Sequence, residues 1–226
     1  MFFLCKRSRI RGLPKKNWSP KDVEMHADWI LGMEPKKYLD SNFRLKRICA
    51  NEEYLVVHII SKRTEPEQGV DLIANEINDF LSIHNQMKIV VTCDQTKSDV
   101  YERTKELSSL FDPNRTEYYE YKSPRELMSI LNGARLVITD KLHVGIVSMN
   151  LGKNVVSVPL HNKTPRLYKQ LNRSDYCVMM NAICKGDVKK RLDMAYNAPE
   201  CNIEQYKADS LENRKFVVEY LKGALK

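Results

Sequence analysis

The sequence predicts a doubly wound α/β domain, in which a Rossmann-like, mostly parallel sheet carries helices on both faces. From residue 54 onward, short apolar runs alternate with longer amphipathic stretches, the pattern of strands joined by crossover helices. The first of these runs, residues 54–60, is almost wholly apolar, as a central strand buried on both faces must be. The length of 226 residues suits one such domain with an appendage and is too short for two full α/β domains.

The first elements form two successive strand–helix units. Residues 54–60 are predicted as a strand because the run is almost continuously apolar, and residues 70–85 as a helix because Leu and Ile recur at helical spacing. The run 88–93 is a second strand, and 98–111 is a second helix with its apolar residues on one side. This repetition indicates parallel neighbouring strands.

A short third strand, at residues 116–121, precedes a strongly marked helix start. Ser123 is the predicted N-cap, with Pro124 at the first helical position and Glu126 at the third, which are the residue types favoured at these places. Gly133 is expected to cap the C-terminus of this helix.

The second half of the chain continues the alternation. The run 134–139 is a fourth strand, 142–151 a fourth helix closed by Gly152, and 154–158 a fifth strand. Weaker patterns predict a helix at 163–172, a last short strand at 176–178, and C-terminal helices at 187–198 and 208–223.

The N-terminal segment differs from the rest in composition. Residues 1–47 carry 12 Lys and Arg against 5 Asp and Glu, whereas the remainder carries 25 against 24. We interpret residues 1–50 as a basic extension, or the remnant of an interdomain crossover, packed on a Rossmann-like domain of residues 51–226 with C-terminal helices. Clustered cations attract nucleic acid or acidic lipid, but no nucleic-acid motif accompanies them, which favours a solvated tail and no nucleic-acid partner.

Several classes of protein lack support in the sequence. The apolar runs are far shorter than the roughly 20 residues of a membrane span, and cations from Lys6 onward leave no room for a signal peptide. The six cysteines form no C-x-x-C pair, which indicates reduced thiols in the cytoplasm and no metal site. No G-x-G-x-x-G, P-loop or G-x-S-x-G motif is present.

Polar and cationic groups follow three of the predicted strands. Ligands of an open parallel sheet bind beyond the carboxyl ends of its strands, where helix N-termini present free N–H groups. A phosphate or carboxylate is therefore the expected ligand. The candidate residues are Lys62 and Arg63 after the first strand, Asp140, Lys141, Leu142 and His143 after the fourth, and Lys163 after the fifth.

Each of these residues also has a simpler interpretation. A single basic residue at a strand exit is more often a solvated loop charge, and His143 taken alone could be a half-buried histidine satisfied by the backbone. His58, within the first apolar run, is better interpreted as a core histidine. Gly145, Ser148 and Gly152 indicate close packing of their helix on the sheet rather than a phosphate loop.

The segment Val137–Val158 resembles the hallmark of the polysaccharide pyruvyl transferase family. That hallmark is an apolar strand, Ser or Thr, an acid, Arg-Leu-His, a helix rich in small residues, Leu-Gly, a second apolar strand and a lysine shortly after. The resemblance covers about Glu53 to Val178. Fainter matches lie upstream, at Lys6–Ser8 and Gly32–Pro35.

The resemblance implies a two-domain, GT-B-like enzyme that transfers the enolpyruvyl unit of phosphoenolpyruvate to a sugar as a ketal, with no cofactor. This chain then corresponds to the C-terminal domain, and the first domain is missing. A saccharide or lipid-linked glycan is the implied acceptor, and a homo-oligomer or an N-terminal domain the implied protein partner.

The resemblance also implies roles for individual residues. His143 is the catalytic residue, as a general acid or an electrostatic partner of the phosphate. The donor is bound by Lys141, which stands where the family usually has arginine, and by Leu142, Asp140 and Lys163, while Lys62 and Arg63 add positive potential. Two alternatives stay open: a GT-B-type nucleotide-sugar glycosyltransferase, and a non-catalytic truncated domain that binds an anion or a glycan.

Overall fold

The computed structural model describes residues 29–45, 52–61 and 67–224, which divide into two units. Residues 34–203 form the larger unit, and the smaller one combines residues up to 33 with residues from 204 onward. The predicted boundary between residues 50 and 51 lies outside the described residues and stays a prediction, as does the packing of the basic extension.

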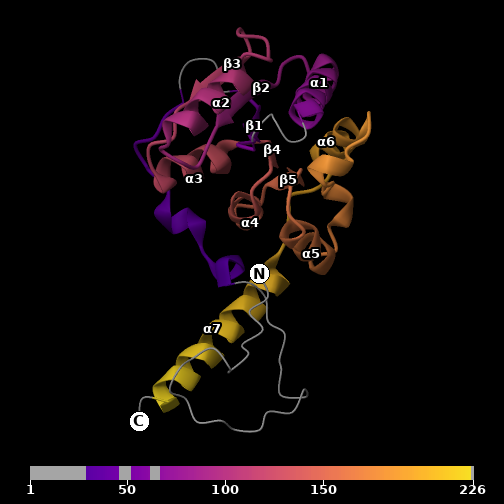
Figure 1. Ribbon diagram of the computed structural model, residues 1–226. Coiled ribbons are helices and arrows are strands. Elements are labelled where there is room, and N and C mark those ends of the chain that lie inside the picture. The colour runs from indigo at the N-terminus through magenta and orange to yellow at the C-terminus, as the bar shows by residue number, and fades with distance from the viewer. Residues whose placement is uncertain (1–28, 46–51, 62–66, 225–226) are drawn as a thin grey trace. The chain divides into compact units, whose positions relative to one another are not determined.

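The larger unit contains one sheet of five parallel strands, in the order β3-β2-β1-β4-β5 (Figure 1). This order places β1 at the centre and reverses between β1 and β4, which confirms the doubly wound, Rossmann-like fold that the sequence predicts. The strands are β1 (Tyr54–His58), β2 (Lys88–Thr92), β3 (Thr116–Tyr119), β4 (Leu136–Thr139) and β5 (Asn154–Ser157).

Helices connect the strands at nearly the predicted places. The larger unit contains α1 (Glu67–Ile83), α2 (Ser98–Ser108), α3 (Pro124–Gly133), α4 (Leu142–Asn150), α5 (Lys163–Gln170) and α6 (Asp187–Asn197), with short 3-10 turns η4 (Pro35–Tyr38), η5 (Ser174–Tyr176) and η6 (Met180–Ala182). The predicted strand at 176–178 is only a single bridge, between Cys177 and Ser157, because η5 occupies the residues before it.

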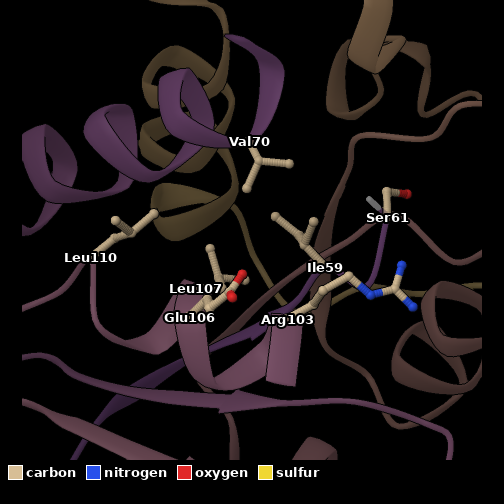
Figure 2. A pocket seen from close by; sticks show the side chains of 7 residues that line it. All are labelled: Ile59, Ser61, Val70, Arg103, Glu106, Leu107 and Leu110. Carbon is tan, nitrogen blue, oxygen red and sulfur yellow. The ribbon is translucent and has the colours of Figure 1, made fainter. Parts of the chain in front are cut away.

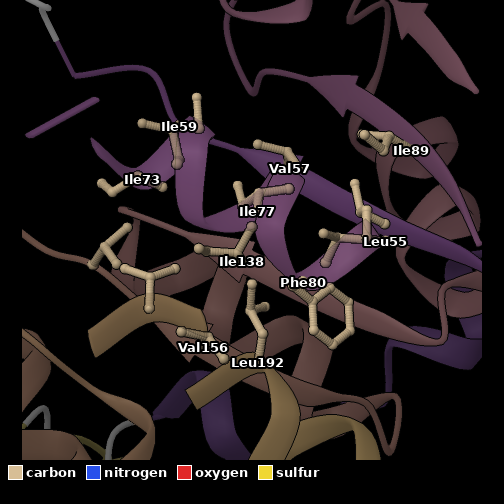
Figure 3. Close-up of a cluster of buried hydrophobic side chains, with 14 of the residues drawn as sticks. Leu55, Val57, Ile59, Ile73, Ile77, Phe80, Ile89, Ile138, Val156 and Leu192 are labelled. Carbon is tan, nitrogen blue, oxygen red and sulfur yellow. The ribbon is translucent and has the colours of Figure 1, made fainter. Parts of the chain in front are cut away.

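One face of the sheet carries a large apolar core (Figure 3). Alternate residues of a strand point to the same face, so Leu55, Val57 and Ile59 pack together against the apolar sides of α1 and α6. Phe80 of α1 and Leu192 of α6 are completely buried in this cluster. The core fixes the sheet, and with it the positions of the strand ends.

On the opposite face, three neighbouring strands end in polar residues. His58 pairs in register with Thr139, and Thr139 with Ser157, so these last residues of β1, β4 and β5 lie side by side. Gly145 of α4 lies over this row: a Cβ added there would be 3.7 Å from Thr139 Cγ2 and 3.6 Å from Ser157 Oγ. The N-terminal half of α4 therefore covers the carboxyl end of the sheet closely.

The ends of α3 and α4 show which local signals the fold uses. Ser123 caps α3 as predicted, since its Oγ accepts a hydrogen bond from the Glu126 amide at 3.3 Å. Gly152 follows α4 with φ of +83°, a left-handed conformation that glycine adopts without strain. Gly133 is not such a cap, because it is the last residue of α3 itself and has no positive φ.

Gly133 instead makes room for Tyr54, so Gly133→Ala is expected to destabilise the larger unit by about 1–3 kcal/mol. An added Cβ would lie 2.2 Å from the Tyr54 hydroxyl, which donates a hydrogen bond to the Ile130 carbonyl at 2.7 Å. Urea unfolding measures the effect, and the same substitution in a Tyr54→Phe background should cost less. An equal cost in both backgrounds would contradict this explanation.

The smaller unit contains the 3-10 turn η3 (Trp29–Gly32) and the long helix α7 (Glu204–Ala224). The Gly32 amide donates a hydrogen bond to Ser210 Oγ at 3.0 Å, and Leu31 is buried. The sequence also has a helix-like stretch at residues 19–31, which Gly32 could cap, and this stretch lies almost wholly outside the described residues. Among the described residues, no helix is long and apolar enough to cross a membrane.

Candidate active site

The candidate site lies where β4 ends and α4 begins. Lys141 precedes the helix with an extended backbone, and Leu142 and His143 form its first turn. The Lys141 and Leu142 side chains are half-buried, whereas His143 is exposed. The first turn of a nine-residue helix thus presents its free N–H groups beside one cation and one accessible imidazole.

Lys163 follows the neighbouring strand, β5. It is the first residue of α5, it is exposed, and β5 is hydrogen-bonded beside β4 in the sheet. The side chains of Lys141, His143 and Lys163 make no hydrogen bond or ion pair with another described residue. The two exits therefore bring uncompensated positive groups to the same edge of the sheet, where an anion would be attracted.

Asp140, which follows β4, is hydrogen-bonded to the residues that follow β1. Its Oδ2 accepts hydrogen bonds from the amides of Ile60 at 3.2 Å and Ser61 at 2.8 Å, and from the Ser61 hydroxyl. The Asp140 amide in turn donates to the His58 carbonyl at 3.2 Å. These contacts give Asp140 a structural task at the site, while its predicted contact with the substrate stays a prediction.

Thr139 holds the backbone at the start of α4. Its Oγ1 accepts a hydrogen bond from the Lys141 amide at 3.0 Å and lies 3.2 Å from His58 Nδ1. His58 is fully buried, as its place in an apolar run indicates. It therefore connects the central strand to the residue before the helix, a connection that the sequence analysis missed.

Two carboxylates face the buried imidazole from other elements. Asp94, which follows β2, has its Oδ1 3.8 Å from His58 Nε2, and Asp140 is close enough to act electrostatically. Burial lowers the pKa of His58 and Lys141 lowers it further, while Asp94 and Asp140 act in the opposite direction. Burial is the largest of these effects, so the net direction is downward and the neutral imidazole is favoured.

A signal for this arrangement exists in the sequence. Four of the apolar strands end in a polar residue, namely His58, Thr92, Thr139 and Ser157. Ser157 Oγ hydrogen-bonds to the hydroxyl of Tyr168, and all four polar residues are buried. Polar residues that end several apolar strands together indicate a functional edge of the sheet.

Two of the predicted site residues, Lys62 and Arg63, lie outside the described residues. A small cavity beside the core is lined by Ile59, Val70 and Arg103, among others (Figure 2). Its volume of about 20 Å³ has room for a water molecule, not for a sugar or a phosphorylated acid. Within the described part of the chain, no cluster of three metal-binding side chains occurs.

The sheet order, the helices on both faces and the cationic strand exits define a Rossmann-like α/β domain of the kind found in GT-B-like enzymes. The chain belongs to the polysaccharide pyruvyl transferase family, because the model of that family matches residues 15–162. The matched region includes Asp140, Lys141, Leu142 and His143 and ends just before Lys163.

Solved structures share the fold at low sequence identity. Staphylococcus aureus MnaA, in a co-structure with UDP, has a TM-score of 0.59 at 11% identity over 90% of this chain and 55% of its own. UDP-GlcNAc 2-epimerase of Methanocaldococcus jannaschii gives 0.57 at 13%, over 90% and 56%. A UDP-forming trehalose-phosphate synthase of Burkholderia xenovorans gives 0.54 at 13%, over 89% and 52%.

The chain spans about half the length of the solved structures it matches. A search of curated proteins finds no match. The family is therefore shown by its own model, and the solved structures show the fold.

Proposed function

We propose that this protein takes part in pyruvyl transfer, in which the enolpyruvyl group of phosphoenolpyruvate becomes a ketal on a glycan. The observation that carries the proposal is the β4–α4 exit, where Lys141, the first turn of α4 and the exposed His143 meet. The family match includes this segment. Phosphoenolpyruvate has a phosphate and a carboxylate, both of which such a cationic helix start favours.

Lys141, Lys163 and the free N–H groups of α4 are proposed to bind the two anionic groups of the donor. Each hydrogen bond to a charged group contributes about 1.5–3 kcal/mol, so two or three are enough for useful affinity. Lysine offers a point charge, whereas arginine would bind a carboxylate or phosphate through two parallel donors. Lys141 therefore supplies attraction, and the helix amides supply the orientation.

His143 is proposed to donate a proton to the methylene carbon of the enolpyruvyl group. Positive charge then develops at the adjacent carbon, where one glycan hydroxyl adds; a second hydroxyl displaces phosphate and closes the ketal. One phosphate leaves for each ketal formed. Of the two protons that the glycan hydroxyls lose, one reprotonates His143 and the other protonates the departing phosphate. Histidine is the side chain that most often acts as general acid or base in enzymes, which suits this exchange.

A thermal-shift panel on the intact protein tests the donor. At about one hundred times its dissociation constant, a ligand stabilises the folded state by about 2.7 kcal/mol. For a protein of this size, that stabilisation raises Tm by roughly 5–10 °C. Phosphoenolpyruvate is expected to give such a shift, and UDP-N-acetylglucosamine is expected to give none.

A thermal shift with UDP-N-acetylglucosamine and none with phosphoenolpyruvate would favour a nucleotide-sugar enzyme and would contradict the proposal. Stabilisation by phosphoenolpyruvate without phosphate release in the presence of extracted glycans would favour the non-catalytic alternative. Lys141→Ala should remove the shift if the ligand binds at the start of α4. Lys190→Ala is the control for the loss of a positive charge elsewhere, because Lys190 is exposed and lies on α6.

A further inference from the structure

His58 has no part in the proposed chemistry, yet its surroundings are unusual for a core residue. The side chain is completely buried, and its Nε2 has no hydrogen-bond partner. Two further buried atoms lack partners: Asp94 Oδ1, 3.8 Å from Nε2, and Asp140 Oδ1. Leaving a buried polar group unpaired costs free energy, so three such atoms at one end of the sheet require an explanation.

The contacts of His58 identify which of its nitrogens carries the proton. Thr139 Oγ1 already accepts the Lys141 amide and has one hydroxyl proton to donate, which Nδ1 at 3.2 Å can accept. Nε2 then carries the ring proton and faces the Asp94 carboxylate. The other tautomer would set a lone pair of Nε2 against that carboxylate, which is unfavourable.

The position of Thr139 makes this contact relevant to the anion site. Its hydroxyl connects His58 to the backbone of Lys141, the residue immediately before α4. Asp140 fixes the same turn from the other side, through Ile60 and Ser61. The direction in which the first amides of α4 point thus depends on a buried chain of contacts that begins at His58.

We infer that His58 is a positioning residue of the anion site, which orients the start of α4 through Thr139 and binds a proton more tightly when an anion occupies the site. The inference rests on the anion site of the proposed function. His58 acts through Thr139 and touches no substrate.

The charges around His58 explain the coupling. Asp94 after β2 and Asp140 after β4 favour the imidazolium, while burial and Lys141 disfavour it and keep the pKa low. An anion at Lys141 offsets the charge of that lysine, so the pKa of His58 rises. By linkage, the affinity for the anion must then increase as the pH falls. Protonation keeps the contact with Thr139, because Nδ1–H then donates to its oxygen.

Sulfate is a suitable probe because it stays a dianion throughout pH 5–7.5. Its binding is followed in the intact protein by NMR of the Leu142 and His143 amides. His58→Leu keeps the apolar volume but loses the contact with Thr139. We expect about tenfold weaker binding at pH 7.5, as if one hydrogen bond from an α4 amide to the anion were lost. His58→Asn places an oxygen near the position of Nδ1 and should restore the affinity. Thr104→Val, which loses a buried hydrogen bond in α2, is the control and should bind normally.

The pH profile separates this role from simple support of the fold. As the pH falls from 7.5 to 5, the affinity of the wild type should rise relative to that of His58→Asn by up to about fivefold, the effect of one charge at a distance of several ångströms. Any pH-dependent group other than residue 58 is common to both proteins, so its effect cancels in this comparison. Asp94→Asn, which removes the carboxylate facing Nε2, should reduce the gain.

The outcomes distinguish the inference from the proposed function. Sulfate that leaves the Leu142 and His143 amides unmoved in the wild type would overturn the anion site and the inference together. Binding that is equal in the wild type and His58→Leu would overturn the positioning role alone. Parallel pH profiles of the wild type and His58→Asn would overturn the coupling, and a failure of asparagine to restore the affinity would overturn the role of the Thr139 contact.

Discussion

Replacing His143 by alanine is expected to slow pyruvyl transfer by about two to four orders of magnitude, the contribution of a well-placed general acid. The imidazole is exposed in the first turn of α4 and makes no hydrogen bond or ion pair with the part of the chain that the structure describes. For the same reason, the free energy of unfolding should change by no more than about 0.5 kcal/mol. Phosphate release from phosphoenolpyruvate with extracted glycans as acceptors measures the rate, and urea unfolding measures the stability.

Two further variants make this result specific. His143→Gln keeps a polar side chain but cannot protonate carbon, so it should be nearly as inactive as alanine while phosphoenolpyruvate still binds. His84→Ala is the control: this histidine precedes β2, at the opposite edge of the sheet, and packs on Phe80 and Tyr196. Normal turnover by His143→Ala would exclude the imidazole as the proton donor.

The fold could be predicted because its signals are local. Four of the five strands are short apolar runs, with β3 as the exception, and the start of α3 is marked by Ser123 at the N-cap, Pro124 at the first helical position and Glu126 at the third. Such features depend on residues a few places apart in the chain. The strand order comes from the structure, which places the fully buried β1 at the centre of the sheet.

What the sequence could not show are contacts between residues far apart in the chain. Gly133 has the residue type of a helix cap, but the reason for it is Tyr54, on another element. His58 was predicted to be buried and is, yet its relation to Thr139 and Asp94 depends on which strands become neighbours. The row of polar strand ends becomes meaningful only once the register places them side by side.

Replacing Glu76 by alanine is expected to lower the free energy of unfolding by about 3 kcal/mol, as when a buried charged acceptor is removed and its donors stay behind. Glu76 lies on α1 and is almost fully buried. Its Oε2 accepts the amides of Val188 at 2.7 Å and Lys189 at 3.0 Å, and its Oε1 accepts that of Gly186. These are N–H groups at the start of α6, where a negative charge also complements the helix dipole.

The contribution of the charge can be separated from that of the hydrogen bonds. Glu76→Gln keeps one acceptor oxygen and the shape but loses the charge, so it should cost less than alanine, roughly 1–2 kcal/mol. Glu102→Ala, at an exposed position of α2, is the matched control and should stay within about 0.5 kcal/mol of the wild type. Because α6 packs on the same apolar core as α1, its loosening should weaken the whole sheet in one cooperative transition. A separate early transition of α6, with the rest unchanged, would contradict that view of the core.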